Sequence, residues 1–91
     1  MKQADIEVGT VYVGKCGKRF RYFDHYTISG AARCWCVRRY SRRGMRMDDS
    51  GRISSARVGT LARWAQRVAT DEETAEVMAV MRASGWREAA P

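Results

Sequence analysis

The alternation of side chains in residues 18–26 is the feature that most constrains the fold of this chain. A repeat of two residues is that of a β-strand, whose successive side chains point to opposite faces of a sheet. A glycine-bounded turn (14–17) and a β-branched, aromatic run (10–13) precede it, so residues 7–26 are predicted to form a β-hairpin. The two faces of its second strand are predicted to hold Phe20, Tyr22, Asp24 and Tyr26 on one side and Arg19, Arg21, Phe23 and His25 on the other.

A third strand is predicted over residues 33–40, after a turn at Gly30. Both of its faces carry apolar groups, which indicates a sheet that curls. Residues 41–51 contain two glycines and a Ser/Asp cluster without a hydrophobic period, so they are predicted to form an exposed, mobile basic loop or a hairpin tip, and a short strand is expected around 52–58. The faces of the third strand are predicted to be Arg33, Trp35, Val37 and Arg39 on one side and Cys34, Cys36, Arg38 and Tyr40 on the other.

From Thr60 the hydrophobic repeat becomes helical, because apolar residues recur at spacings of three and four up to Val68, and Thr60 is the expected N-cap. A second helix is predicted from the capping-box sequence of residues 70–73, in which three consecutive acids lie where the helix dipole favours them. This helix is expected to end at Gly85, with Trp86 packing back on Met81. Residues 87–91 are expected to fray.

Together these segments predict one domain over residues 1–91, of the α+β class. A small curled antiparallel sheet of three to five strands fills most of residues 1–58, and residues 60–84 are predicted to be helical. At this length, a second copy of the chain or another partner would add stability, so a homodimer is one expectation. No run approaches the roughly 18 apolar residues of a membrane span, and the first residues lack the apolar core of a secretion signal, so we expect a cytoplasmic protein without membrane contact.

Positive charge is concentrated in the first half of the sequence. Residues 1–47 contain eleven Lys and Arg against three Asp and Glu, whereas residues 48–91 contain six against seven. A regional excess raises the local potential and attracts anions. Fourteen of the seventeen basic residues are Arg, whose planar guanidinium matches phosphate and carboxylate groups.

The basic residues of this half are predicted to form a binding surface on the sheet and the following loop. Aromatic residues (Phe23, Trp35 and Tyr40) are interleaved with them, and this combination is typical of sheets that bind single strands or RNA. No helix with a sequence-reading pattern is evident, so base recognition in the major groove is not expected. The predicted binding residues are Lys15, Lys18, Arg19, Arg21, Arg38, Arg39, Tyr40, Arg42, Arg43 and Arg46.

Two other kinds of site have less support in the sequence. The single histidine, His25, follows Asp24 on a strand, where neighbours point to opposite faces, so no catalytic arrangement is predicted and we expect a protein that is not an enzyme. Zinc binding by Cys16, His25, Cys34 and Cys36 is chemically reasonable, but their spacing is not that of a zinc knuckle. We expect these thiols to be small buried groups and expect no cofactor, and zinc stays as the alternative.

Residues 7–66 contain a hairpin motif, Gly9-x-x-Tyr12-x-Gly14-Lys15-x-Gly17-x-x-Arg21, then a strand, a Gly/Arg-rich loop and a helix that begins at Thr60 with the sequence TLARWA. In this order of features the chain resembles small uncharacterised proteins of bacteriophages and prophages. It also resembles an SH3-like barrel with helical additions. The resemblance implies an accessory role in a bacterial host cell: binding nucleic acid, or binding and blocking a host machine such as a CRISPR effector through an acidic patch on it.

Overall fold

The computed structural model describes residues 1–25, 32–48, 53–55 and 58–87, with residues 25, 32–33 and 53–55 described by their backbone alone. It is an α+β structure, as the sequence predicts. The strands are β1 (Thr10–Gly14), β2 (Arg19–His25), β3 (Ala32–Tyr40), β4 (Gly44–Met47), β5 (Ile53–Ser55) and β6 (Ala65–Val68). The helical elements are the 3₁₀ turn η1 (Gln3–Asp5) and the helices α1 (Val58–Trp64) and α2 (Asp71–Ala83).

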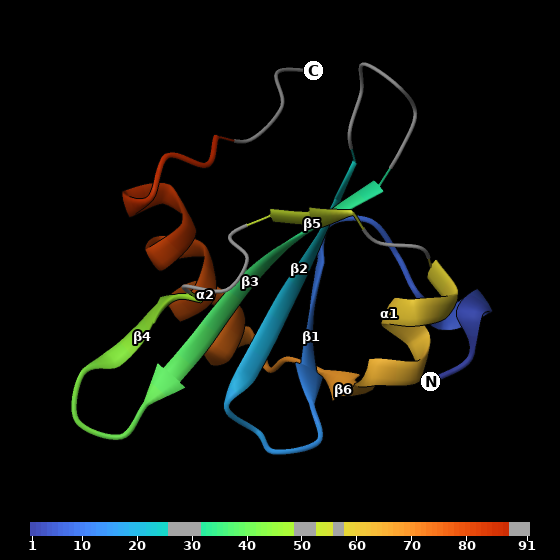
Figure 1. Cartoon of the computed structure of the whole chain (residues 1–91), viewed down its shortest axis with the longest axis horizontal. Coiled ribbons are helices and arrows are strands. Elements are labelled where there is room, and N and C mark those ends of the chain that lie inside the picture. The colour runs from blue at the N-terminus through green and yellow to red at the C-terminus, as the bar shows by residue number, and fades with distance from the viewer. Residues whose placement is uncertain (26–31, 49–52, 56–57, 88–91) are drawn as a thin grey trace.

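The strands form one antiparallel sheet with the order β4-β3-β2-β1-β6, and β5 pairs with the first part of β3 (Figure 1). The predicted hairpin is confirmed as β1 and β2, with its turn at residues 15–18. The predicted third strand is β3, and β5 lies inside the segment where a short strand was expected. The order places β1 inside the sheet, between β2 and the edge strand β6.

The two faces of the sheet are covered by different helices (Figure 1). One face, the α2 face, packs its apolar side chains against the Val77 and Met81 side chains of α2. The other face, the α1 face, packs against Leu61 of α1. The assignment of β2 and β3 side chains to faces is therefore confirmed for the core residues that the structure describes. The buried residues of the α2 face are Val11, Val13, Phe20, Tyr22, Trp35 and Val37, and those of the α1 face are Tyr12, Phe23 and Cys34.

The predicted exposed loop over residues 41–51 is wrong for residues 44–47, which form β4. The sequence Met45-Arg46-Met47 alternates, and its two methionines pack partly buried against the core of the α2 face. Backbone pairing with the end of β3 and this apolar contact outweigh the turn-like composition of the segment. The alternative prediction, a hairpin tip, is confirmed for residues 41–43, which form the turn between β3 and β4.

The predicted helix from Thr60 to Val68 is also wrong in its second half. The helix α1 begins at Val58, so Thr60 lies inside it and is not its N-cap, and the chain leaves the helix after Trp64 to form β6. Pairing between β6 and β1 gives hydrogen-bond partners to an edge of β1 that would otherwise be open. This long-range pairing outweighs the local helical repeat.

The predicted ends of α2 are both confirmed. Thr70 and Glu73 form the reciprocal capping box, in which the side chain of each accepts a hydrogen bond from the backbone N–H of the other. At the carboxyl end Gly85 has φ 107°, and the Trp86 N–H donates to the Met81 carbonyl at 3.0 Å. This is a Schellman motif, and it turns the Trp86 indole back into the core of the α2 face.

Several sequence predictions lie outside the described residues: the turn at Gly30, the last part of the 41–51 loop, and the fraying of residues 88–91. Among the helices that the structure describes, none has both the length and the apolar character needed to cross a membrane.

Trp86→Ala is expected to destabilise the fold by about 3–5 kcal/mol, a large part of the ~5–15 kcal/mol typical of a small domain. The indole is 2% exposed, its ring meets that of Tyr22 edge-on with centroids 5.4 Å apart, and its Nε1 donates to Asp24 at 3.4 Å. Urea denaturation followed by circular dichroism measures the loss. The exposed substitution Arg63→Ala serves as control and should stay within about 0.5 kcal/mol; equal midpoints for the two variants would contradict the role of Trp86.

Candidate nucleic-acid interface

Three arginines lie side by side on three neighbouring strands. Arg19 of β2 is the register partner of Arg38 of β3, and Arg38 is the register partner of Arg46 of β4. Register partners of an antiparallel pair point to the same face, so the three side chains form a row, here called the arginine row. Arg19 and Arg46 are exposed and Arg38 is half-buried. Like charges directly opposite one another are destabilising, so an anion bound between them would relieve an existing repulsion.

Aromatic rings support two arginines at this end of the sheet. The Cζ atom of Arg38 lies 5.4 Å from the centroid of the Tyr40 ring, and that of Arg21 lies 4.6 Å from the centroid of the Trp64 ring. A guanidinium that rests its face on a ring keeps the N–H groups along its edge available for hydrogen bonds. The rings therefore restrict the motion of the arginines and leave the donors that a phosphate requires accessible.

Trp64 owes its place to Gly14 of β1. A Cβ atom at position 14 would lie 2.7 Å from the indole, closer than real Cβ contacts allow, so the ring rests directly on the glycine backbone. Sequence reasoning assigned Trp64 to the apolar stripe of a helix and did not include it in the site. No sequence pattern connects Gly14 with Trp64, because the contact arises only when β6 pairs with β1.

Two recesses border the arginine row. The tryptophan recess has a volume of about 420 Å³, and the tyrosine recess has a volume of about 180 Å³. Arg38 lines the first and its register partner Arg46 lines the second, so the recesses are next to each other. The tryptophan recess is lined by Gly14, Lys15, Cys16, Lys18, Arg19, Arg38 and Trp64, and the tyrosine recess by Tyr40, Arg43, Arg46 and Met47.

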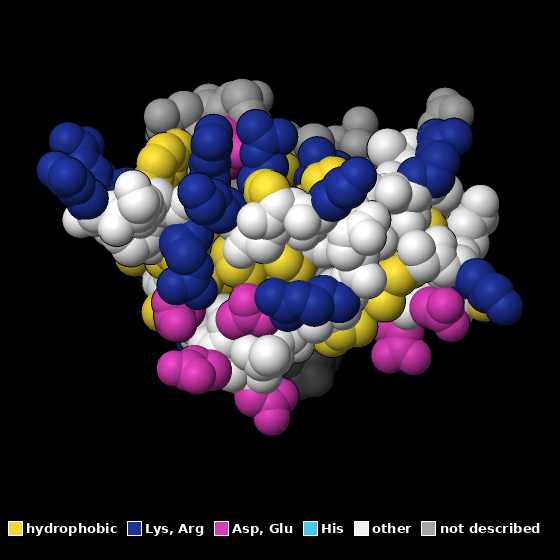
Figure 2. Space-filling model, turned by 90° about the horizontal axis from the view of Figure 1, so that it is seen from below, with side chains coloured by type: hydrophobic (Ala, Val, Ile, Leu, Met, Phe, Trp, Pro, Cys, Tyr) yellow, Lys and Arg dark blue, Asp and Glu magenta, His cyan; other side chains and the backbone are white. Residues whose placement is uncertain are grey.

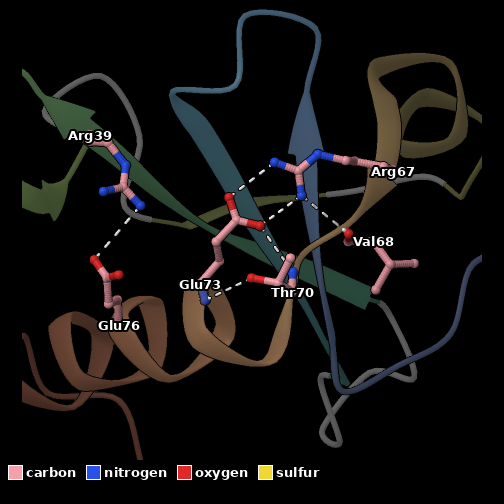
Figure 3. A network of polar contacts seen from close by, with 6 residues as sticks. All are labelled: Arg39, Arg67, Val68, Thr70, Glu73 and Glu76. Atoms are coloured by element: carbon pink, nitrogen blue, oxygen red, sulfur yellow. Dashed lines mark hydrogen bonds and ion pairs between the residues drawn. The ribbon is translucent and has the colours of Figure 1, made fainter.

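Acidic side chains neutralise arginines on the α2 face. Arg67 of β6 pairs with Glu73 through two hydrogen bonds of 2.6 and 3.0 Å, and Arg39 of β3 lies 3.7 Å from Glu76 (Figure 3). In the described part of the chain, no carboxylate pairs with any member of the arginine row. Figure 2 shows the resulting separation, with Lys and Arg side chains across the upper and central part of the view and acidic side chains along its lower part.

The structure brings most of the predicted binding residues together. Arg21 lies on Trp64, and Arg42 is exposed in the β3–β4 turn. Arg39 is the exception, because it lies on the α2 face near Glu76 and over the Phe20 ring, so the structure does not bring it together with Arg38. The residues that line the two recesses from the predicted set are Lys15, Lys18, Arg19, Arg38, Tyr40, Arg43 and Arg46.

The aromatic residues predicted to be interleaved with the basic ones differ in accessibility. Phe23 and Trp35 are 3% and 8% exposed and belong to the cores of the two faces, so they do not offer a ring to a ligand. Tyr40 is half-buried and remains at the surface. The aromatic residues that line the recesses are therefore Tyr40, which was predicted, and Trp64, which was not.

The cysteines differ in environment, and the expectation of buried thiols is wrong for Cys16. This thiol is exposed in the β1–β2 turn, and hydrogen bonding to the backbone of Lys18 lowers its pKa below the usual 9.0. Cys34 is buried, and desolvation raises its pKa to about 11. Among the described residues, no three His, Cys, Asp or Glu side chains are grouped so as to hold a metal ion. The side chain of His25 is not among those described.

Comparison with protein-family models, with curated proteins and with solved structures finds no match to this chain.

The Arg67–Glu73 pair predicts a specific pH dependence of stability. The pair and the Thr70 N–H lower the pKa of Glu73 to about 2, below the ~4.3 of an unfolded chain. Its stabilisation is therefore complete above pH ~4.3 and is lost as the pH falls through about 2. We expect Glu73→Gln to cost about 1 kcal/mol at pH 7, with the difference from wild type disappearing toward pH 2. Urea denaturation across this range measures it. The control is Glu72→Gln at an exposed position; a pH-independent cost of Glu73→Gln would contradict the assignment.

Cys16 should be alkylated much faster than Cys34 in the folded protein at pH ~7.5, because its thiol is exposed and its pKa is lowered while that of Cys34 is raised. Iodoacetamide labelling followed by peptide mass spectrometry measures both rates. Cys16→Ser should remove the fast reaction and keep the slow one. Equal rates at the two thiols in the native state would show that the β1–β2 turn does not have the described environment.

Proposed function

We propose that this protein binds nucleic acid through the arginine row and the rings beside it, and that it acts by binding rather than by catalysis. The observation that carries the proposal is the absence of a paired carboxylate at Arg19, Arg38 and Arg46 within the described structure. Guanidinium groups bind phosphate oxygens through two parallel hydrogen bonds, and the summed attraction of several such contacts supplies most of non-specific affinity. The three arginines of the row, together with the basic residues in both recesses, can contact successive phosphates of a nucleic-acid chain.

The fold and the sequence resemblance support an accessory role. We propose that the sheet is SH3-like, because a short helix leads into a last strand, β6, that returns to pair with β1. Residues 7–66 resemble phage and prophage proteins, which supports an origin in a phage and a site of action in the cytoplasm of a bacterial host. The resemblance implies a role in which the protein acts on nucleic acid or on a host machine.

The proposal is tested by fluorescence anisotropy with a labelled oligonucleotide at several salt concentrations. Wild type should bind with an affinity whose logarithm falls linearly with the logarithm of salt concentration. Arg19→Gln/Arg38→Gln/Arg46→Gln should weaken binding and reduce the size of the slope by about 2, since each lost phosphate contact on a single strand removes about 0.7.

A matched control removes the same charge elsewhere. The variant Arg39→Gln/Arg82→Gln/Arg87→Gln changes three arginines on or beside the α2 side of the sheet, and it should keep the wild-type slope within about 1 unit. Equal effects of the two triple variants would mean that net charge, and not the arginine row, governs affinity. Absence of binding by wild type even at low salt would reject the proposal.

One observation favours a second candidate function, binding to an acidic patch on a bacterial protein. The tyrosine recess combines Tyr40 and Met47 with Arg43 and Arg46, and aromatic residues, Met and Arg are the types enriched at protein–protein interfaces. A complex of this kind has a packed apolar centre, so it would persist at salt concentrations that dissociate phosphate contacts. The same salt series therefore separates the two functions.

A further inference from the structure

The two recesses and the arginine row form one continuous surface that crosses the strands. Neighbouring strands lie ~4.8 Å apart, so the backbones that carry Arg19, Arg38 and Arg46 are spaced by about that distance. The tryptophan recess lies at the β2 side of the row and the tyrosine recess at its β4 side. A ligand that follows this path meets basic side chains throughout and an aromatic ring at each end.

The tryptophan recess has the size and lining of a site for one nucleobase. Its volume of about 420 Å³ falls in the range of roughly 300–1,000 Å³ that small-molecule sites occupy. The Trp64 indole rests on Gly14 and carries the Arg21 guanidinium over its ring, so the flat surface offered to a base is that of the guanidinium, a kind of surface on which unpaired bases stack. The tyrosine recess is smaller and contains two arginines, which suits a phosphate group.

A double helix does not fit this arrangement. Its bases are paired and stacked inside, so they cannot enter a recess beside Trp64 unless the duplex opens. The longer of the described helices, α2, lies on the opposite face of the sheet, and Asp71, Glu72 and Glu76 on its exposed side would repel phosphates in a major groove. The described part of the site thus lacks a helix that could enter a major groove. It has instead the basic and aromatic groups with which proteins bind single strands.

Resting on the proposed function, we infer that the ligand is a single strand of nucleic acid, with one base stacked on the Arg21–Trp64 pair at the tryptophan recess and the phosphates on either side bound by the arginine row. The chain crosses the sheet from β2 to β4. Duplex DNA binds only through general charge attraction, and it is therefore the weaker ligand.

Trp64 provides an internal reporter for this inference. It is half-buried at the surface of the recess, whereas Trp35 and Trp86 are 8% and 2% exposed in the core of the α2 face. A base that stacks on the Arg21–Trp64 pair quenches the fluorescence of Trp64 and leaves the emission of the two buried indoles unchanged. Cys16 lines the same recess, so the same bound strand slows its alkylation.

The experiment compares ~12-nucleotide single-stranded DNA, single-stranded RNA and a DNA duplex of the same sequence, by anisotropy and by tryptophan fluorescence. We expect a single strand to bind at least about tenfold tighter than the duplex at moderate salt, to quench the fluorescence and to protect Cys16. Trp64→Leu should weaken single-strand binding about tenfold, since it removes the ring that holds the Arg21 guanidinium for stacking and a stacked base contributes that order of affinity, and it should not change duplex binding. Trp64→Phe keeps a ring, so it should retain most of the affinity and lose the quenching.

The outcomes separate this inference from the proposed function. Equal affinity for single strand and duplex, with Trp64→Leu affecting neither, would overturn the single-strand inference and leave nucleic-acid binding in place. No binding of any oligonucleotide at low salt would overturn both. Circular dichroism of Trp64→Leu confirms that it is folded. If it is not, the quenching and Cys16 protection of the wild-type protein decide the question: a single strand that binds without either effect contradicts the inference.

Discussion

The antiparallel register between β2 and β3 is the constraint on which the other features of this structure depend. It pairs Phe20 with Val37 and Tyr22 with Trp35 on the α2 face, and in the same step it pairs Arg19 with Arg38 on the opposite side. A slip by one residue would turn the arginines toward α2 and the core side chains toward water. The burial of the α2 face therefore fixes the position of the arginine row, although these three arginines contribute nothing to that core.

The two faces of the sheet handle positive charge in different ways. On the α2 face, the acids at the start of α2 cap the helix, and Glu73 and the nearby Glu76 also pair with arginines of the sheet (Figure 3). On the other side α1 covers the part around Phe23 and Cys34, and the basic end stays open. Helix α2 thus supplies apolar contacts and also acidic side chains that pair with arginines. Helix α1 supplies apolar contacts but no acidic side chain, and its exposed Arg63 is basic. The asymmetry of the surface follows from this difference between the helices.

Local patterns predicted the hairpin, the faces of β2 and β3, and both ends of α2, because each depends on residues close together in the sequence. The sequence could not predict β4 or β6, since Met45-Arg46-Met47 is too short a pattern and β6 is stabilised by a partner over fifty residues away. For the site, alternation placed Arg39 and Arg38 on opposite faces of the third strand, but the predicted binding set included basic residues of both faces and therefore Arg39. Trp64 was missed because its place depends on a long-range contact with Gly14.

The walls of the tryptophan recess come from two sources with different tolerance to change. Gly14 and Trp64 are fixed by their mutual contact, whereas Lys15, Cys16 and Lys18 belong to an exposed turn that takes no part in either core. Substitutions in that turn alter the shape and charge of the recess at little cost in stability. The recess that we propose as a base site can thus change its lining during evolution while the sheet and its two helices stay the same.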